Sequence, residues 1–329
     1  MSPKVKRIVR TVLRRAVGYP LFFIACFVFF AYHTFPYARA KDAVLRKVSS
    51  QLGPGVTLEA SSLEPSWLTG VDVRNLRIHK AASRPKGEPL DVTVDALHAR
   101  AGLFAALSGA VALSFDGKLA GGTFDGELHR SDTAQALRLE LDGVHVAALG
   151  LGKALLGIPI KGVLSGKVHV DLPKELQQST GDLDLSIAGC SVGDGKAKLH
   201  LSGMPGGLTI ETLNLGTLDL RGQLNGVKGR ISEITAHGQD ADIDGNGEVQ
   251  LVRPLARSRV SLLARVQFAD AYKHRNDRTE ALFSLLDFTP GAQSAKTSSG
   301  ALQYEVVGAL GGPINARPAG SKPLEPPGG

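Results

Sequence analysis

Apolar and polar residues alternate with a period of two along most of the chain after residue 56. The alternation is clearest over 71–73, 90–94, 111–115, 137–141, 168–172, 183–187, 197–201 and 260–268. Side chains on a strand point to opposite faces, so each segment has one apolar and one polar face. Turn signals such as Asp142-Gly143, Asp194-Gly195 and Asn225-Gly226 separate them at intervals of about ten residues. The pattern predicts a mainly β fold of antiparallel strands.

A helical period precedes these strands. Tyr37, Ala40, Val44, Val48 and Leu52 recur at steps of three and four residues, which predicts an amphipathic helix over 38–52 that ends at the glycines after it. Its opposite face is basic. Such a helix either lies on anionic lipid headgroups or caps the following domain with its apolar face, and we favour capping.

Other interruptions of the alternation are short. The pattern predicts short helices or loops over 103–107 and 146–156, a helix over 270–286 and a last strand over 302–307. The β domain is therefore expected to extend over 53–310. Residues 311–329 are rich in Gly and Pro and poor in large apolar residues, so we expect a disordered tail.

Residues 17–37 carry no charge and are long enough for one transmembrane helix. The apolar anchor residues are Leu21, Phe22, Phe23, Ile24, Phe27, Val28, Phe29 and Phe30, and the preceding tail (1–16) carries the cations Lys4, Lys6, Arg7, Arg10, Arg14 and Arg15. These cations favour a cytoplasmic N-terminus and place the rest of the chain across the membrane. A cleaved signal peptide, ending near Ala38-Arg39-Ala40, is the alternative. Continuation of the apolar run into a helical pattern favours retention.

Composition narrows the classes of function. Six of the seven net positive charges lie in the first fifteen residues, so the folded region carries about +1 and offers no basic stripe for nucleic acid. The two cysteines, Cys26 and Cys190, fall in different environments and predict no internal disulfide. The 39 glycines fit many short strands with tight turns.

The apolar faces consist mainly of Leu, Val, Ile and Ala, and aromatic residues make up only 5% of the chain. In a closed sandwich such a surface is core, whereas in an open, curled sheet it is a groove for alkyl chains. Alternation alone does not separate the two. The candidate groove lining is Leu139, Val168, Val170, Leu183, Leu185, Ile187, Leu199, Leu201, Leu262 and Val266.

Motifs for chemistry are weak. Asp240, Asp242, Asp244 and Gly245 match the opening of a calcium loop, but the twelfth position is Leu251 where a bidentate carboxylate is needed, and the flanks are strand-like. A strand with outward carboxylates is the favoured interpretation. Phosphate-loop, zinc and nucleophile motifs fail on spacing or residue type. We therefore expect that the protein is not an enzyme and binds no cofactor.

The order of parts resembles a known family. A basic tail, one span and an amphipathic helix are followed by the segment 67–78, the run 121–126, the turn 157–162 and the closing run 300–313. This succession resembles AsmA-like proteins of Gram-negative envelopes, and its end looks like that of the short N protein of type II secretion systems (GspN). The resemblance implies an inner-membrane anchor and a periplasmic sheet curled into an open, apolar trough. It supplies no catalytic residue.

Two functions follow as expectations. The first is an accessory, single-pass inner-membrane subunit of a type II secretion system that acts through protein contacts in the periplasm, where unpaired edge strands are templates for a partner. The alternative is a periplasmic lipid-binding or lipid-transfer module, because larger relatives are thought to carry phospholipids. The expected partners are thus the membrane, other secretion-system subunits and phospholipid, without nucleic acid. About 260 exported residues argue against bridging the periplasm.

Overall fold

The computed structural model describes Cys26 and residues 37–52, 55–66, 69–81, 89–102, 110–199, 208–310 and 314–324. Apart from Cys26 and Tyr37, the expected span over 17–37 lies outside these residues, as do the six cations of the N-terminal tail. Among the helices that are described, none combines the length and the apolar character needed to cross a bilayer.

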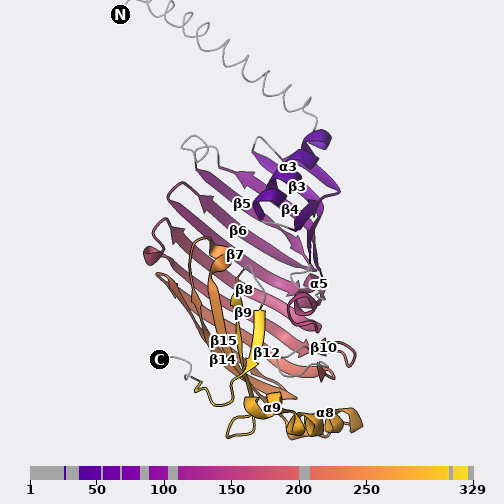
Figure 1. Cartoon of the computed structure of the whole chain (residues 1–329). Coiled ribbons are helices and arrows are strands. Elements are labelled where there is room, and N and C mark those ends of the chain that lie inside the picture. The colour runs from indigo at the N-terminus through magenta and orange to yellow at the C-terminus, as the bar shows by residue number, and fades with distance from the viewer. Residues whose placement is uncertain are drawn as a thin grey trace, which may run out of the picture.

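A single large antiparallel sheet forms the body of the molecule, and it is not closed on itself (Figure 1). The strand order is β1-β3-β4-β5-β6-β7-β8-β9-β12-β13-β14-β15-β16-β17, with β2 also paired to β3. Its strands are β1 (Val56–Glu59), β2 (Ser62–Ser66), β3 (Gly70–Lys80), β4 (Leu90–Ala101), β5 (Val111–Leu119), β6 (Gly122–Arg130), β7 (Ala134–His145), β8 (Ile160–Pro173), β9 (Thr180–Val192), β12 (Leu213–Asn225), β13 (Lys228–His237), β14 (Ala241–Gln250), β15 (Arg259–Phe268), β16 (Leu302–Ala309) and β17 (Ile314–Pro318). Because most neighbours in the sheet are also neighbours in sequence, the fold is a long meander, as the turn signals predict.

Helices lie mainly at the two ends of this meander (Figure 1). They are α3 (Tyr37–Leu52), α5 (Val146–Leu149), α6 (Leu151–Leu156), α7 (Asp270–Lys273), α8 (Asp277–Phe288) and α9 (Pro290–Ala295), with 3₁₀ turns η2 (Leu176–Gln178) and η3 (Leu255–Arg257). The helix predicted over 270–286 is divided into α7 and α8. Asn276 separates them because its side chain accepts hydrogen bonds from the backbone N–H groups of Arg278 and Thr279 and caps α8.

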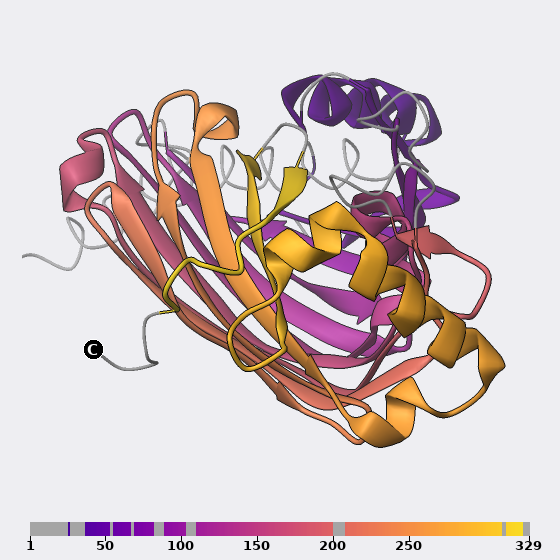
Figure 2. The same cartoon turned by 60° about the horizontal axis from the view of Figure 1, so that its bottom comes forward.

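The sheet is strongly curved, as the view from the α8 end shows (Figure 2). Two observations show that the curvature brings distant strands together. Arg253, which follows β14, donates from Nη2 to the carbonyl of Pro173 at the end of β8 over 2.9 Å, although three strands lie between β8 and β14. Leu310, just after β16, lines the same cavity as Val170 of β8. The body is therefore a trough.

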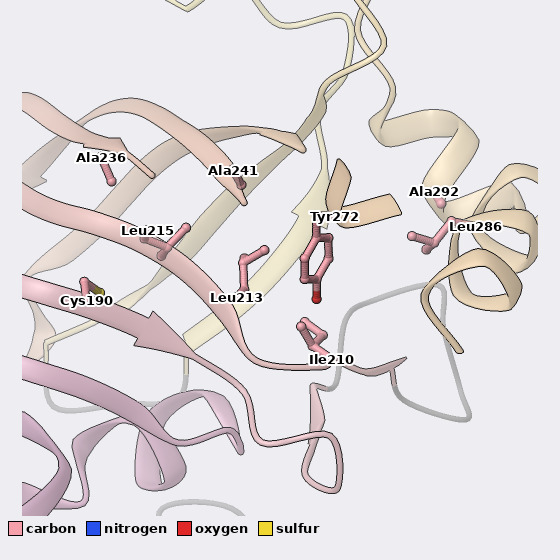
Figure 3. Close-up of a cluster of buried hydrophobic side chains, with 9 residues drawn as sticks. All are labelled: Cys190, Ile210, Leu213, Leu215, Ala236, Ala241, Tyr272, Leu286 and Ala292. Atoms are coloured by element: carbon pink, nitrogen blue, oxygen red, sulfur yellow. The ribbon is translucent and has the colours of Figure 1, made fainter. Parts of the chain in front are cut away.

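Two clusters of buried apolar side chains lie toward the two ends of the trough, and a smaller buried group, including Val144 and Ile158, lies beside α5 at the adjoining ends of β7 and β8. At the N-terminal end, Leu45 of α3 packs against Val73, Leu76 and Val94 of β3 and β4. At the other end, the larger cluster joins the strand ends of β9, β12 and β13 to α7, α8 and α9 (Figure 3). Its nine buried members are Cys190, Ile210, Leu213, Leu215, Ala236, Ala241, Tyr272, Leu286 and Ala292. Helices thus cover the apolar face of the sheet near each end.

Three sequence expectations need correction. The chain after residue 311 is not wholly disordered, because Ile314–Pro318 forms β17 and the buried Gln303 donates from its amide to the carbonyls of Ala319 and Lys322. Asp142-Gly143 does not close a hairpin; it lies at a bulge inside β7, where Gly143 has φ +69°. The strand expected over 197–201 does not join the large sheet: its described part forms β10 (Lys198–Leu199), which pairs with β11 (Leu208–Thr209) in a separate small sheet, and residues 200 and 201 lie outside the described residues.

Candidate functional site

The register of the sheet aligns apolar residues into continuous rows across the trough face. One row runs through Phe115, Gly126, Leu139, Val168, Leu183, Gly222, Ile231, Gly247, Leu262 and Val306. Each residue lies opposite the next on the adjacent strand, so their side chains share one face. The two-residue period of each strand and the pairing of neighbours together produce a broad apolar surface.

This surface is half-exposed in its middle section. Leu139, Val168, Leu183 and Leu185 all have intermediate burial, whereas the core residues Val144 and Leu215 at the strand ends are 0% and 2% exposed. In a closed sandwich a second layer would bury the middle positions as fully as the ends. Among the described residues, the apolar face is therefore an open trough along the middle of these strands, with buried core at strand ends.

A cavity of about 300 Å³ lies on the trough face near one set of strand ends. Its lining includes Val170 of β8, Leu183 of β9 and Leu224 of β12, together with Leu255 and Leu310. The exposed atoms that line it are apolar. The hydrogen bond from Arg253 to Pro173 joins β14 to β8 at this end of the strands and holds the curvature.

Glycines shape the floor of this cavity. Leu224 of β12 lies between two glycines, Gly181 on β9 and Gly229 on β13, each directly opposite it. One large side chain is thus flanked by two positions that have no side chain. A Cβ atom added at Gly181 would lie 2.6 Å from the backbone oxygen of His169, so close strand approach excludes a side chain there. At Gly229 the nearest atom would be the Cβ of Val249 at 3.4 Å, an ordinary contact. The empty space above Gly229 is therefore not imposed by the backbone.

The opposite face of the same strands is charged. A second row of directly paired positions contains Asp72, His98, Asp116, Asp125, Glu140, Lys167, Asp184, Arg221 and Glu233. Lys167 pairs with Glu140 at 2.9 Å and Arg221 with Glu233 at 3.0 Å. A hydrogen bond from His98 lowers the pKa of Asp72. These exposed pairs contribute little stability, and they mark the water-facing side of the sheet.

One polar group lies among the apolar positions. Tyr304 of β16 stands opposite Ala264 of β15, on the trough face. Its hydroxyl is buried and has no hydrogen-bond partner among the described residues. Burial raises the pKa of this phenol. An unpaired buried hydroxyl costs about 1–3 kcal/mol, so this atom is available to a hydrogen-bonding group that approaches from the trough.

Eight of the ten residues predicted from the sequence to line a groove share the trough face. Leu139, Val168, Val170, Leu183, Leu185 and Leu262 lie in its half-exposed section, whereas Ile187 and Val266 pack against the cluster at the helical end. Leu199 is not part of this face because it belongs to β10 of the small sheet. Leu201 lies outside the described residues.

Several lining residues escaped the sequence analysis. Gly222, Leu224, Gly229 and Ile231 line the cavity from β12 and β13. Glycines occupy apolar-face positions there and interrupt the two-residue alternation on which the prediction depended. The signal that identifies β12 is the run Leu218, Leu220, Gly222 and Leu224, in which glycine takes the place of an apolar side chain.

The three carboxylates of the weak calcium motif serve other contacts. Asp240 is buried, accepts a hydrogen bond from the backbone N–H of Asn214 at 2.7 Å and pairs with Arg275. Asp242 on β14 lies 3.3 Å from His237. Asp244 is on the same strand and does not converge with them, since no three ligand-type side chains in the described part of the chain are grouped to hold a metal ion.

Comparison with known proteins gives no relative. No protein-family model, curated protein or solved structure matches the chain. The function must therefore be argued from the site itself.

Proposed function

We propose that this chain binds lipid acyl chains in its apolar trough, as a lipid-binding or lipid-transfer module. One observation carries the proposal: a continuous apolar face, curved inward and uncovered by described residues between its two ends. A soluble protein does not usually leave a contiguous apolar surface of this extent in water, and such surfaces mark binding sites.

The dimensions of the trough suit an acyl chain. From β5 to β15 the sheet contains nine strands, which at about 4.8 Å per strand extend over roughly 40 Å. The hydrocarbon core of a bilayer is about 30 Å thick, so one leaflet of acyl chains measures about 15 Å. Each methylene removed from water contributes about 0.8 kcal/mol, and ten of them offer roughly 8 kcal/mol before the costs of association.

Neighbouring residues on β9 provide the test. Leu185 faces the trough, whereas the preceding residue, Asp184, faces water on the outer side of the sheet. A photo-reactive benzoylphenylalanine at position 185 of the full chain is expected to form lipid adducts in cells, detected by mass spectrometry. The same group at position 184 is the matched control and is expected to form none. Equal labelling at both positions, or no lipid at 185 in folded protein, would refute the proposal.

A second candidate is the accessory role in a type II secretion system, acting through protein contacts in the periplasm with an inner-membrane anchor. The observation that favours it is the sheet edge: β17 pairs with β16 on one side only, and no other described strand adjoins it. Unpaired backbone groups of an edge strand accept a partner's strand. Co-purification of the full chain with secretion-system subunits tests this role, and normal secretion in a deletion strain without such co-purification would contradict it.

A further inference from the structure

Helix α8 is apolar on two opposite sides. Leu282 and Phe283 pack against the cluster at the end of the trough, and Leu286 is buried within it. On the outer side, Leu285 is 60% exposed and Phe288 is 82% exposed, the largest exposed fraction among the large apolar residues of the described chain. Ala281 is also exposed and lies four residues before Leu285. The steps of four and three residues place these side chains on one ridge along the helix.

The ridge is held rigidly. The capping box at Asn276 fixes the start of α8, and at its other end Thr289 donates from its hydroxyl to the carbonyl of Leu285 over 2.8 Å. Rings of Phe268, Tyr272 and Phe283 stack and cross beneath the helix at centroid distances of 5.0 to 6.1 Å. A rotation that buried Phe288 would therefore expose Phe283 and break this aromatic cluster.

The size and charge of the ridge identify its occupant. Two large side chains present a few hundred Å² at most, well below the approximately 800 Å² per partner that a stable protein interface buries. A lipid bilayer needs no complementary shape and accepts an isolated apolar ridge. The neighbouring cations are already paired: Lys296 contacts Asp287 at 2.5 Å, and Arg278 contacts Glu211 at 3.3 Å. Neither of these two cations is therefore free to select anionic lipid.

We propose that the α8 ridge inserts into the surface of a lipid bilayer and so places the end of the trough against acyl chains. This inference rests on the proposed function and extends it, because the inner side of the same helix covers the trough. Figure 1 places α8 at the end of the molecule opposite α3, so the inserted end is remote from the helix that follows the N-terminal segment.

The test uses a fluorescent reporter in the full chain. Phe288→Trp is introduced together with Trp67→Phe, which removes the only native tryptophan. The protein is reconstituted in phosphatidylcholine vesicles and mixed with a second population of phosphatidylcholine vesicles, with brominated lipid in one population or the other. We expect the emission of the tryptophan at position 288 to shift to shorter wavelength. We also expect brominated lipid to quench at least half of this emission. A tryptophan in place of Asp184, on the outer face of the sheet, is the control and is expected to remain unquenched.

A loss variant checks that the ridge itself binds. Leu285→Ser with Phe288→Ser leaves Leu282 and Leu286 in place, so the melting temperature is expected to stay within a few degrees while tethering of the second vesicles falls at least tenfold. Absence of quenching by brominated lipid in either population overturns the inference. A blue shift that depends on protein concentration without added vesicles also overturns it, because a second copy then covers the ridge.

The two proposals fail separately. Lipid adducts at position 185 together with an unquenched reporter at position 288 would support lipid binding in the trough and refute insertion of the ridge into a bilayer. A quenched reporter without adducts at 185 shows bilayer insertion and removes the trough as the lipid site, and with it the stated role of the ridge.

Discussion

Filling the trough without disturbing the fold is the sharpest perturbation that the structure allows. Gly229 lies on the cavity floor, is not at positive φ, and has room for a Cβ atom, with Val249 Cβ at 3.4 Å and Leu224 Cδ1 at 3.6 Å. Gly229→Leu therefore projects a side chain into the cavity of about 300 Å³. Gly181→Leu is the contrasting variant, because its Cβ would collide with the backbone of β8.

The expected magnitudes follow from these contacts. Replacing a strand glycine removes a penalty of about 0.5–1 kcal/mol, so Gly229→Leu is expected to be neutral or stabilising. Its side chain displaces three to four methylenes of a bound acyl chain, which costs about 3 kcal/mol of binding free energy, or roughly a hundredfold in affinity. Gly181→Leu instead forces β8 and β9 apart, and we expect it to lower stability by more than about 1 kcal/mol.

The assay combines thermal unfolding, followed by the β-sheet circular dichroism signal, with photo-crosslinking from position 170 in the same cavity. For Gly229→Leu we expect an unchanged or higher melting temperature and loss of nearly all lipid adduct at sub-saturating lipid. If Gly229→Leu unfolds the protein, the cavity is packed core and the reasoning is refuted. Retention of the adduct at its original level would refute it as well, because lipid then binds elsewhere.

The other predictions concern stability. Leu215→Ala, at a 2% exposed core position, is expected to lower the free energy of unfolding by about 2–5 kcal/mol. Leu185→Ala in the half-exposed trough should lower it by about 1 kcal/mol or less. Equal losses in denaturant unfolding would contradict an open trough. Hydrogen bonds, chiefly from Lys322, lower the pKa of Glu305 from 4.5 to about 2, so its contribution to stability is complete above pH 4.5 and is lost as the pH falls towards 2. Glu305→Gln should be less stable at pH 7 and lose less stability over that interval, and parallel pH profiles of the two proteins would count against this. Tyr304→Phe removes the unpaired buried hydroxyl and is expected to leave the melting temperature unchanged or raise it, whereas a drop of several degrees would reveal a partner for that hydroxyl.

Local pattern located many of the strands but not all of them, nor their full extent. The segments predicted at 168–172 and 183–187 lie inside the longer strands β8 and β9, because each of these strands has one apolar and one charged face. Alternation does not specify curvature, which comes from contacts far apart in sequence, such as Arg253 with Pro173. Alternation therefore does not separate groove from core, and the half-exposed state of Leu185 is what separates them.

Glycine positions on the apolar face were the main omission from the sequence-based prediction. Gly222 and Gly229 are apolar-face positions, but a hydrophobicity pattern counts them as breaks. The C-terminal strand β17 was missed for a related reason, since its place depends on the buried polar residues Gln303 and Glu305 and not on its own apolar content. The ridge of α8 was likewise hidden, because five large apolar residues within 282–288 suggest only a buried helix.

Native mass spectrometry of the full chain, ejected from detergent-free lipid particles, tests most directly whether the trough holds lipid. Wild-type protein is expected to retain one more phospholipid-mass adduct than Gly229→Leu, which keeps the same N-terminal segment and therefore the same surrounding lipid. Identical adduct distributions for the two folded proteins would contradict a lipid-filled trough.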